Sequence, residues 1–305
     1  IDTIYENYKV AQNPEITLEA NPDDLSEEYL IELSKIGINR LSIGIQSFFE
    51  DDLAMMNRAH NSVEAQKCLE LATQYFDNIS IDLIYGVPGM SNAQWQQNIE
   101  TALRFGVPHI SSYALTVEPK TALNTLIQKG KIDAPKDEVA EAHFQILVET
   151  LEKNGFIHYE LSNFGKENYF SKNNSAYWLG KKYIGIGPSA HSYDGISRSW
   201  NVANNALYLK AIQQNQLPNE KEILSTADRY NEYIMTGLRT IWGVALDRIE
   251  REFGMDYLDY LIKQSEKFVK DELLAIENNI LKPTSKGKFL TDGIASDLFY
   301  INLEE

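Results

Sequence analysis

Strand-like and helix-like segments alternate over residues 1–200, and this alternation limits the chain to few folds. Short apolar runs bounded by turn residues predict strands, and the segments between them repeat apolar residues at helical spacing. The predicted strands are residues 16–20, 40–48, 78–89, 109–119, 158–164 and 181–193. Strands that alternate with helices favour βαβ units and a parallel sheet. Six such strands in series, with polar residues at their ends, predict an α/β fold of the partial (β/α)6 TIM-barrel type.

The pattern changes after Trp200. From Thr226 onward the sequence is mainly helical, and residues 278–299 predict a small strand pair followed by a short helix. We therefore predict two domains, a partial barrel at residues 1–200 and a mainly helical, winged-helix-like C-terminal domain at residues 201–305. Because the second domain shows no basic face, docking or packing is favoured over DNA binding for it.

The composition excludes several classes of partner. With 28 basic and 44 acidic residues the net charge is −16, which argues against nucleic acid and anionic membranes, because phosphate contacts need clustered Lys and Arg. No apolar run is long enough for a transmembrane segment, and no signal-peptide pattern opens the sequence. The one cysteine, Cys68, allows no internal disulfide and fits a reducing, cytoplasmic location. It lies in an amphipathic helical segment, so we expect a buried thiol.

Polar residues stand at the ends of several predicted strands. Glu19 and Gln46 each close a strand, and strand ends open onto the active-site face of a β/α barrel, so both suggest ligand contacts. Capping of the following turns is an equally good explanation for them. Asp82 lies within an apolar strand, where a carboxylate is costly unless it is paired or faces a ligand. The alternative for Asp82 is a hydrogen bond to a neighbouring strand or to Arg40. Arg58 returns toward the same edge, or else forms a surface salt bridge.

The histidines show no metal-site spacing, and no catalytic residue is indicated by the residues alone. The five histidines are His60, His109, His143, His158 and His191. None forms an i, i+4 or HExxH pair. His143 is predicted to pack within a helix, whereas His60 and His191 lie near strand-end loops and could meet in space. The glycine-rich GIGPSAH segment is not followed by the Lys-Ser/Thr of a phosphate loop, and the chain contains no G-x-S-x-G elbow.

Seven sequence blocks occur in an order that resembles one known family. They are EANP, NRLSIGIQSF, NRAH, DLIYGVPG, HYELSNF, YWLGKKYIGIGPSAHSY and GLRTIWGV. The set is similar to the radical S-adenosylmethionine (SAM) family that contains oxygen-independent coproporphyrinogen III oxidase and the haem chaperone HemW, and it covers nearly the whole chain. HYELSNF, the Tyr177-Trp178 pair and the run from Ser189 to His191 resemble HemW more than the oxidase.

The resemblance implies a partial barrel that binds a [4Fe-4S] cluster and SAM. It places side-chain contacts to SAM at Glu19, Gln46, Arg58 and Asp82, and a backbone contact at Ala114. These residue types suit the ligand, because SAM carries an amino group, a carboxylate, ribose hydroxyls and an adenine edge. Acids, an arginine and an amide can meet such groups by charge-assisted or bidentate hydrogen bonds.

The sequence departs from the family pattern in two places. The C-x3-C-x2-C cluster motif and the GGGTP segment, which the family has before the strand at residues 16–20, are absent, and Cys68 cannot replace the motif. We therefore expect an N-terminally truncated chain without the first strand and the cluster loop, which binds no cluster, cleaves no SAM and is inactive as an enzyme. Asn173 is the second departure, because HemW-like chains usually have histidine there.

Three functions follow as alternatives from the resemblance. The favoured one is a HemW-like protein that binds haem and passes it to apo-haemoproteins. The second is a true anaerobic oxidase that converts two propionates of coproporphyrinogen III to vinyl groups by radical oxidative decarboxylation. The third is a cluster-less module that binds porphyrin or SAM. The implied partners are haem or porphyrin, apo-haemoproteins and an electron donor such as flavodoxin, and the implied cofactors are SAM and, in a full-length protein, the cluster.

Overall fold

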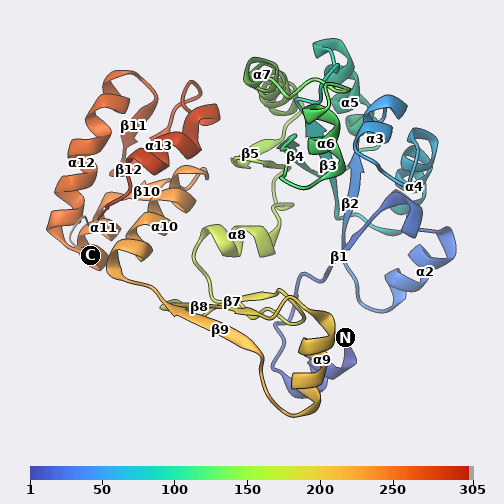
Figure 1. Cartoon of the computed structure of the whole chain (residues 1–305), viewed down its shortest axis with the longest axis horizontal. Coiled ribbons are helices and arrows are strands. Elements are labelled where there is room, and N and C mark those ends of the chain that lie inside the picture. The colour runs from blue at the N-terminus through green and yellow to red at the C-terminus, as the bar shows by residue number, and fades with distance from the viewer. Residues whose placement is uncertain (302–305) are drawn as a thin grey trace. The chain divides into compact units, whose positions relative to one another are not determined.

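Residues 1–301 are described by the computed structural model, and the contacts within the chain divide it into two units, Ile1–Ser171 and Lys172–Glu305 (Figure 1). The division falls earlier than the predicted boundary after residue 200. The segment between these two boundaries contacts the C-terminal helices: Arg198 forms an ion pair with Glu232, and the Arg239 guanidinium lies 5.1 Å from the ring centroid of Trp178.

A six-stranded sheet forms the centre of the first unit. Its strands are β1 (Thr17–Ala20), β2 (Arg40–Gln46), β3 (Ile79–Tyr85), β4 (His109–Ala114), β5 (Ile157–Glu160) and β6 (Asn163–Gly165). The order across the sheet is β1-β2-β3-β4-β6-β5. The pairs β1–β2, β2–β3 and β3–β4 are parallel, as the alternating pattern predicts. Strand β6 is antiparallel to both β4 and β5.

Two predicted strands take other forms. The run at residues 158–164 is not one strand, because residues 161 and 162 turn the chain between β5 and β6. The run at residues 181–193 lies in the second unit and contributes β7 (His191–Tyr193) to a separate sheet. The six strands of the first sheet are therefore not the six that the sequence pattern predicts in series.

Helices precede and connect the strands of the first unit (Figure 1). They are α1 (Asp2–Asn7), the 3-10 turn η1 (Pro22–Asp24), α2 (Glu27–Lys35), α3 (Glu50–Met55), α4 (Ser62–Tyr75), α5 (Asn92–Arg104), α6 (Ala122–Gln128) and α7 (Asp137–Lys153). Side chains start several of them: Asn61 and Ser91 each form a capping box, with Glu64 and Gln94. Gly37 follows α2 with φ 89°, a left-handed conformation that glycine adopts readily after a helix end.

The two faces of the parallel strands differ in polarity. Alternate side chains such as Leu41, Ile43, Ile81 and Ile110 are fully buried, and so are Leu69, Trp95 and Leu147 of the helices. Registered neighbours share a face, and on the opposite face Glu19 lies beside Ser42, and Asp82 beside Ser111. Polar side chains therefore line the inner face of the sheet.

The second unit contains a three-stranded antiparallel sheet and a helical module. The sheet, in the order β7-β8-β9, adds β8 (Ser197–Asn201) and β9 (Asn219–Ile223), with α8 (Lys172–Trp178) before it and α9 (Asn205–Gln213) between β8 and β9. The module contains α10 (Thr226–Leu238), α11 (Leu246–Phe253), α12 (Met255–Lys270) and α13 (Thr291–Asp297), with η2 (Lys288–Leu290) before α13. Its strands β10 (Val244–Ala245), β11 (Leu274–Glu277) and β12 (Ile280–Pro283) form a second small sheet.

The helical module has a core of its own. Tyr230, Ile234, Val244, Ile249 and Leu281 are fully buried in one apolar cluster that joins its helices to its small sheet. Helices with a β wing confirm the winged-helix-like C-terminal part. None of the helices described up to residue 301 combines the length and the apolar character that a membrane crossing requires.

Candidate functional site

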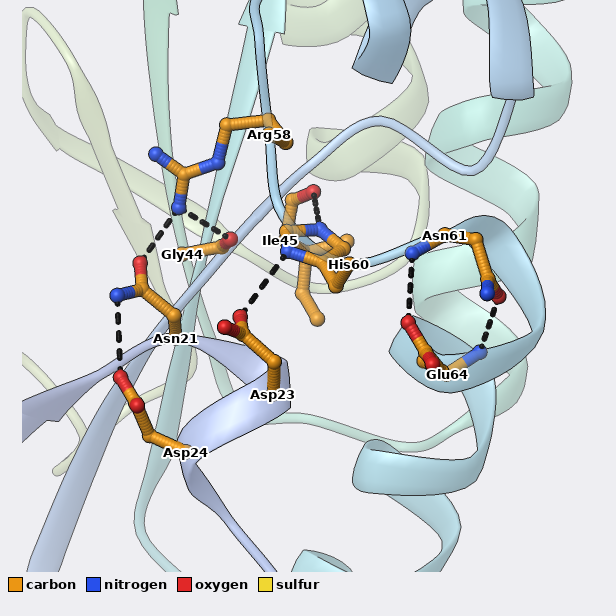
Figure 2. A network of polar contacts seen from close by, with 9 residues as sticks. All are labelled: Asn21, Asp23, Asp24, Gly44, Ile45, Arg58, His60, Asn61 and Glu64. Carbon is orange, nitrogen blue, oxygen red and sulfur yellow. Dashed lines mark hydrogen bonds and ion pairs between the residues drawn. The ribbon is translucent and has the colours of Figure 1, made fainter.

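The ends of β1 and β2 carry a group of polar side chains around Gly44 (Figure 2). Nη2 of Arg58 donates to Oδ1 of Asn21 at 2.5 Å and lies 3.4 Å from the carbonyl oxygen of Gly44. Asn21 in turn donates to Asp24 at 3.1 Å. Arg58 follows α3, and its side chain points back toward the strand ends, which is the first of the two predicted positions. Among residues 1–301 it forms no salt bridge.

Gly44 occupies a position that no larger residue could fill without displacing these side chains. A Cβ on Gly44 would lie 2.8 Å from Nε2 of Gln46 and 3.3 Å from Nη2 of Arg58. Gln46 ends β2 with φ 67°, just after the β2–β3 register shifts, so its backbone leaves the regular strand conformation here. The missing side chain at Gly44 therefore lets the polar ends of Gln46, Arg58 and Asn21 come together against the backbone of β2.

His60 ties the loop that carries Arg58 to the sheet. Its side chain is fully buried, with Nε2 3.1 Å from the carbonyl oxygen of Ile45 and Nδ1 3.7 Å from Asp23 (Figure 2). Asn61 follows directly and caps α4. His60 therefore links Asp23, which follows β1, to Ile45 near the end of β2. His191 belongs to the other unit.

Asp82 lies on the inner face of β3 in surroundings that disfavour its charge. Burial raises the pKa of Asp82 to about 6, against the effects of a hydrogen bond from Ser111 and of the positive charges of Arg40 and Arg58, while the charge of Glu19 raises it further. Ser111 also lies 2.6 Å from Oδ1 of Asn163, so its single hydroxyl proton serves one acceptor at a time. A buried carboxyl with a pKa raised toward neutrality is a candidate for ligand binding.

A buried chain of hydrogen bonds extends the inner face away from Asp82. His109 contacts Ser80 through Nδ1 at 2.6 Å and the Tyr159 hydroxyl through Nε2 at 2.8 Å. Burial lowers the pKa of His109 to about 3, so this imidazole is neutral and accepts at one nitrogen while donating at the other. Arg40, which is 4% exposed, has an Nε without a hydrogen-bond partner among the described residues. The sequence analysis considered Arg40 as a partner of Asp82, but it did not predict the hydrogen bonds that join Ser80, His109 and Tyr159.

The remaining predicted contacts lie near the same strand ends. Glu19 is exposed on β1, in register with Ser42 of β2. Ala114 is the last residue of β4, in register with Tyr85, and Leu115 after it donates its N–H to the Tyr85 carbonyl oxygen. The structure thus brings Gln46 and Arg58 together around Gly44, places Glu19 and Ala114 near the ends of β1 and β4, and places Asp82 in the middle of β3. Asn21 is the main residue of this group that the sequence analysis did not select, although it directly follows the first strand.

The cysteine and histidine side chains do not form a metal site. Cys68 is 3% exposed, as predicted, and burial raises the pKa of its thiol to about 12, so it is not a thiolate ligand. His143 packs against Trp95 and accepts the N–H of Gly86 at 3.1 Å, which confirms its packing role. Within residues 1–301, no three acidic, histidine or cysteine side chains are grouped closely enough to hold a metal ion.

Parallel strands with this polar edge fit the radical SAM class, and the comparison with family models assigns the chain to it. The model of the radical SAM superfamily matches residues 1–102, and that of the HemN C-terminal domain matches residues 224–290. "Heme chaperone HemW" of Bacillus subtilis is 36% identical over 279 residues, covering 90% of this chain and 73% of the relative. "Heme chaperone HemW" of Lactococcus lactis is 33% identical, covering 92% and 76%. The chain therefore belongs to the HemW family.

A solved structure supports the fold independently. Coproporphyrinogen III oxidase (HemN) from Escherichia coli, described as a radical SAM enzyme, superimposes with a TM-score of 0.81 over 98% of this chain and 72% of its own length. The two sequences are 20% identical, so the likeness concerns the fold alone. It confirms the predicted TIM-type barrel with a helical C-terminal domain.

Proposed function

We propose that this chain handles haem as a chaperone, binding it together with SAM and transferring it to apo-haemoproteins. The observation that carries the proposal is the 30–36% identity to proteins named haem chaperone HemW over most of the chain. The oxidase alternative has weaker support, since only the fold likeness at 20% identity points to it. A cytoplasmic location is part of the proposal and is supported by the lone, buried thiol.

The residues at the strand ends fit SAM. Nε of Arg58 is buried without a hydrogen-bond partner among the described residues, so this guanidinium has a donor left for a carboxylate. The absence of a side chain at Gly44 lets the polar ends of Gln46 and Arg58 lie side by side against the backbone. We assign the SAM-binding side chains to Glu19, Gln46, Arg58 and Asp82, and a backbone contact to Ala114.

Each of these residues has a separate task in binding. Arg58, fixed by Asn21, pairs with the carboxylate, and the Gln46 amide offers both a donor and an acceptor. Asp82 and Glu19 accept hydrogen bonds from an amino group or from ribose hydroxyls. Bound SAM supplies a sulfonium centre whose carbon–sulfur bond can be broken by reduction. The contribution of this chain is to hold that ligand and to keep its charged groups paired.

The residues of this chain do not fit a [4Fe-4S] cluster. Such a cluster needs several cysteine thiolates, and the chain contains one cysteine, which is buried and protonated. The chain covers about three quarters of the length of its HemW relatives.

Two titrations test the proposal. Haemin should bind the chain at one equivalent, seen as a shifted Soret band that stays with the protein through gel filtration. Calorimetry should show SAM binding to the unmodified chain and a loss of roughly tenfold or more in affinity for Arg58→Ala, since a charge-assisted pair is lost, with Arg248→Ala on α11 as the control. Absence of haem binding would refute the chaperone proposal, and equal SAM affinity of Arg58→Ala and the unmodified chain would refute the site.

A further inference from the structure

A haem-binding protein holds the iron through a side chain with an accessible donor atom, and four of the five histidines of this chain are buried. Their exposed fractions are 0–6%, and each has at least one ring nitrogen in an internal contact: His60 with Ile45, His109 with Ser80 and Tyr159, His143 with Gly86, and His158 with Leu161. The second nitrogens of His60 and His143 have no hydrogen-bond partner among the described residues, but they are buried and closed to a ligand as large as haem. The buried thiol of Cys68 is equally inaccessible. At Asn173 the chain carries an amide that binds ferric iron poorly compared with an imidazole.

His191 differs from the other four histidines because its side chain is exposed. It is exposed on β7, and none of the residues described up to position 301 forms a hydrogen bond with its ring. Its cross-strand neighbour on β8 is Trp200, with ring centroids 6.2 Å apart. The imidazole thus has a free nitrogen beside a large flat aromatic side chain.

The sheet face that carries His191 is rich in aromatic side chains. Because opposite residues of an antiparallel pair share a face, His191 and Trp200 lie on the same side as Tyr193 and its partner Arg198. Tyr183 forms a bridge with Tyr193 at the edge of β7, and their ring centroids are 6.1 Å apart. A row of aromatic rings next to an exposed imidazole matches the flat apolar surface and the iron of a haem group.

Charge distribution along this face favours one orientation of the haem. On β9, Glu220 lies in register with Trp200, and Glu222 with Arg198, so the β9 edge is acidic. Beyond β7, the exposed Lys181 and Lys182 precede Tyr183. The two haem propionates are therefore repelled from β9 and attracted toward the lysine side.

We propose that His191 is the axial ligand of the haem carried by this chain, with the macrocycle lying along the aromatic face formed by Trp200, Tyr193 and Tyr183. The inference rests on the proposed haem-chaperone function and assigns its ligand. The imidazole nitrogen donates its lone pair to the iron, and no bond is broken in the protein.

The test compares haemin complexes of the unmodified chain, His191→Ala and His191→Met by absorbance and electron paramagnetic resonance. His191→Ala should lose the imidazole-type spectrum and bind haemin roughly tenfold or more weakly, equivalent to about 1.4 kcal/mol. Added imidazole should restore the spectrum, which a purely structural role would not predict. His191→Met should bind with a thioether-type spectrum instead. Met255→Leu, which removes an exposed methionine on α12, serves as the control and should leave spectrum and affinity unchanged.

The outcomes separate the two proposals. If the unmodified chain binds no haemin, the chaperone proposal fails and the ligand assignment fails with it. If the unmodified chain binds haemin and His191→Ala keeps the same spectrum and affinity, only the assignment of His191 is overturned. Circular dichroism and thermal unfolding of His191→Ala should match the unmodified chain, because the side chain is exposed and without a hydrogen bond.

Discussion

Replacing Asp82 by asparagine should make the protein more stable at neutral pH while weakening SAM binding. Burial raises the pKa of this carboxyl from 3.8 to about 6. The folded protein therefore keeps the proton over a pH range in which the unfolded chain has lost it, and stability falls as the pH rises from about 4 through 6. A shift of about 2 units at 1.36 kcal/mol per unit gives a penalty of about 3 kcal/mol at pH 7, and Asp82→Asn removes it.

Urea unfolding of both proteins at several pH values measures this effect. The gain in free energy of unfolding for Asp82→Asn should be about 2–3 kcal/mol at pH 7 and should disappear near pH 4, where the folded carboxyl is already protonated. Glu141→Gln on the exposed side of α7 provides a matched acid-to-amide control with no such pH dependence. A gain that is absent at pH 7, or equal at pH 4 and 7, would refute the reasoning that burial of the Asp82 charge is costly.

Three further outcomes follow from the packing and the site. Gly44→Ala should weaken SAM binding roughly tenfold, because the new Cβ displaces the amide end of Gln46, whereas Gly293→Ala, which has open space, should bind SAM normally. Cys68 should react with iodoacetamide at pH 8 far more slowly in the folded protein than in guanidinium, and equal rates would contradict its burial. Trp95→Ala should cost about 3–5 kcal/mol in urea unfolding, since the indole is fully buried; a loss under 1 kcal/mol would show that the cavity collapses.

Local sequence patterns predicted the parallel part of the first unit because its signals are local. Strands β1 to β4 are apolar runs followed by helical periodicity, and parallel connections through helices require that order. The position of polar residues after the predicted strands also indicated that Gln46 and Arg58 lie at the same edge, and the structure places both beside Gly44. Polar residues that directly follow a strand are visible in the sequence, and the strand direction then decides on which edge they meet.

Other features depend on contacts between distant residues. The run at residues 158–164 is apolar enough for one strand, and only pairing of Asn163 with Ser111 on β4 shows that it folds back as a hairpin. The strand β9 is exposed along its whole length, so hydrophobic alternation could not reveal it. The hydrogen bonds from Ser80 to His109 and from His109 to Tyr159 join residues 29 and 50 positions apart, which no spacing rule connects.

Haem transfer tests the central claim most directly. The chain is loaded with one equivalent of haemin and mixed with an apo-haemoprotein such as apomyoglobin, and the Soret band of the acceptor is followed over time, with haemin-loaded serum albumin as the passive donor. A haem chaperone should deliver haem to the acceptor at a rate that rises with acceptor concentration and exceeds transfer from albumin. A rate independent of acceptor concentration and no faster than from albumin would show simple release of haem and would contradict the proposed function.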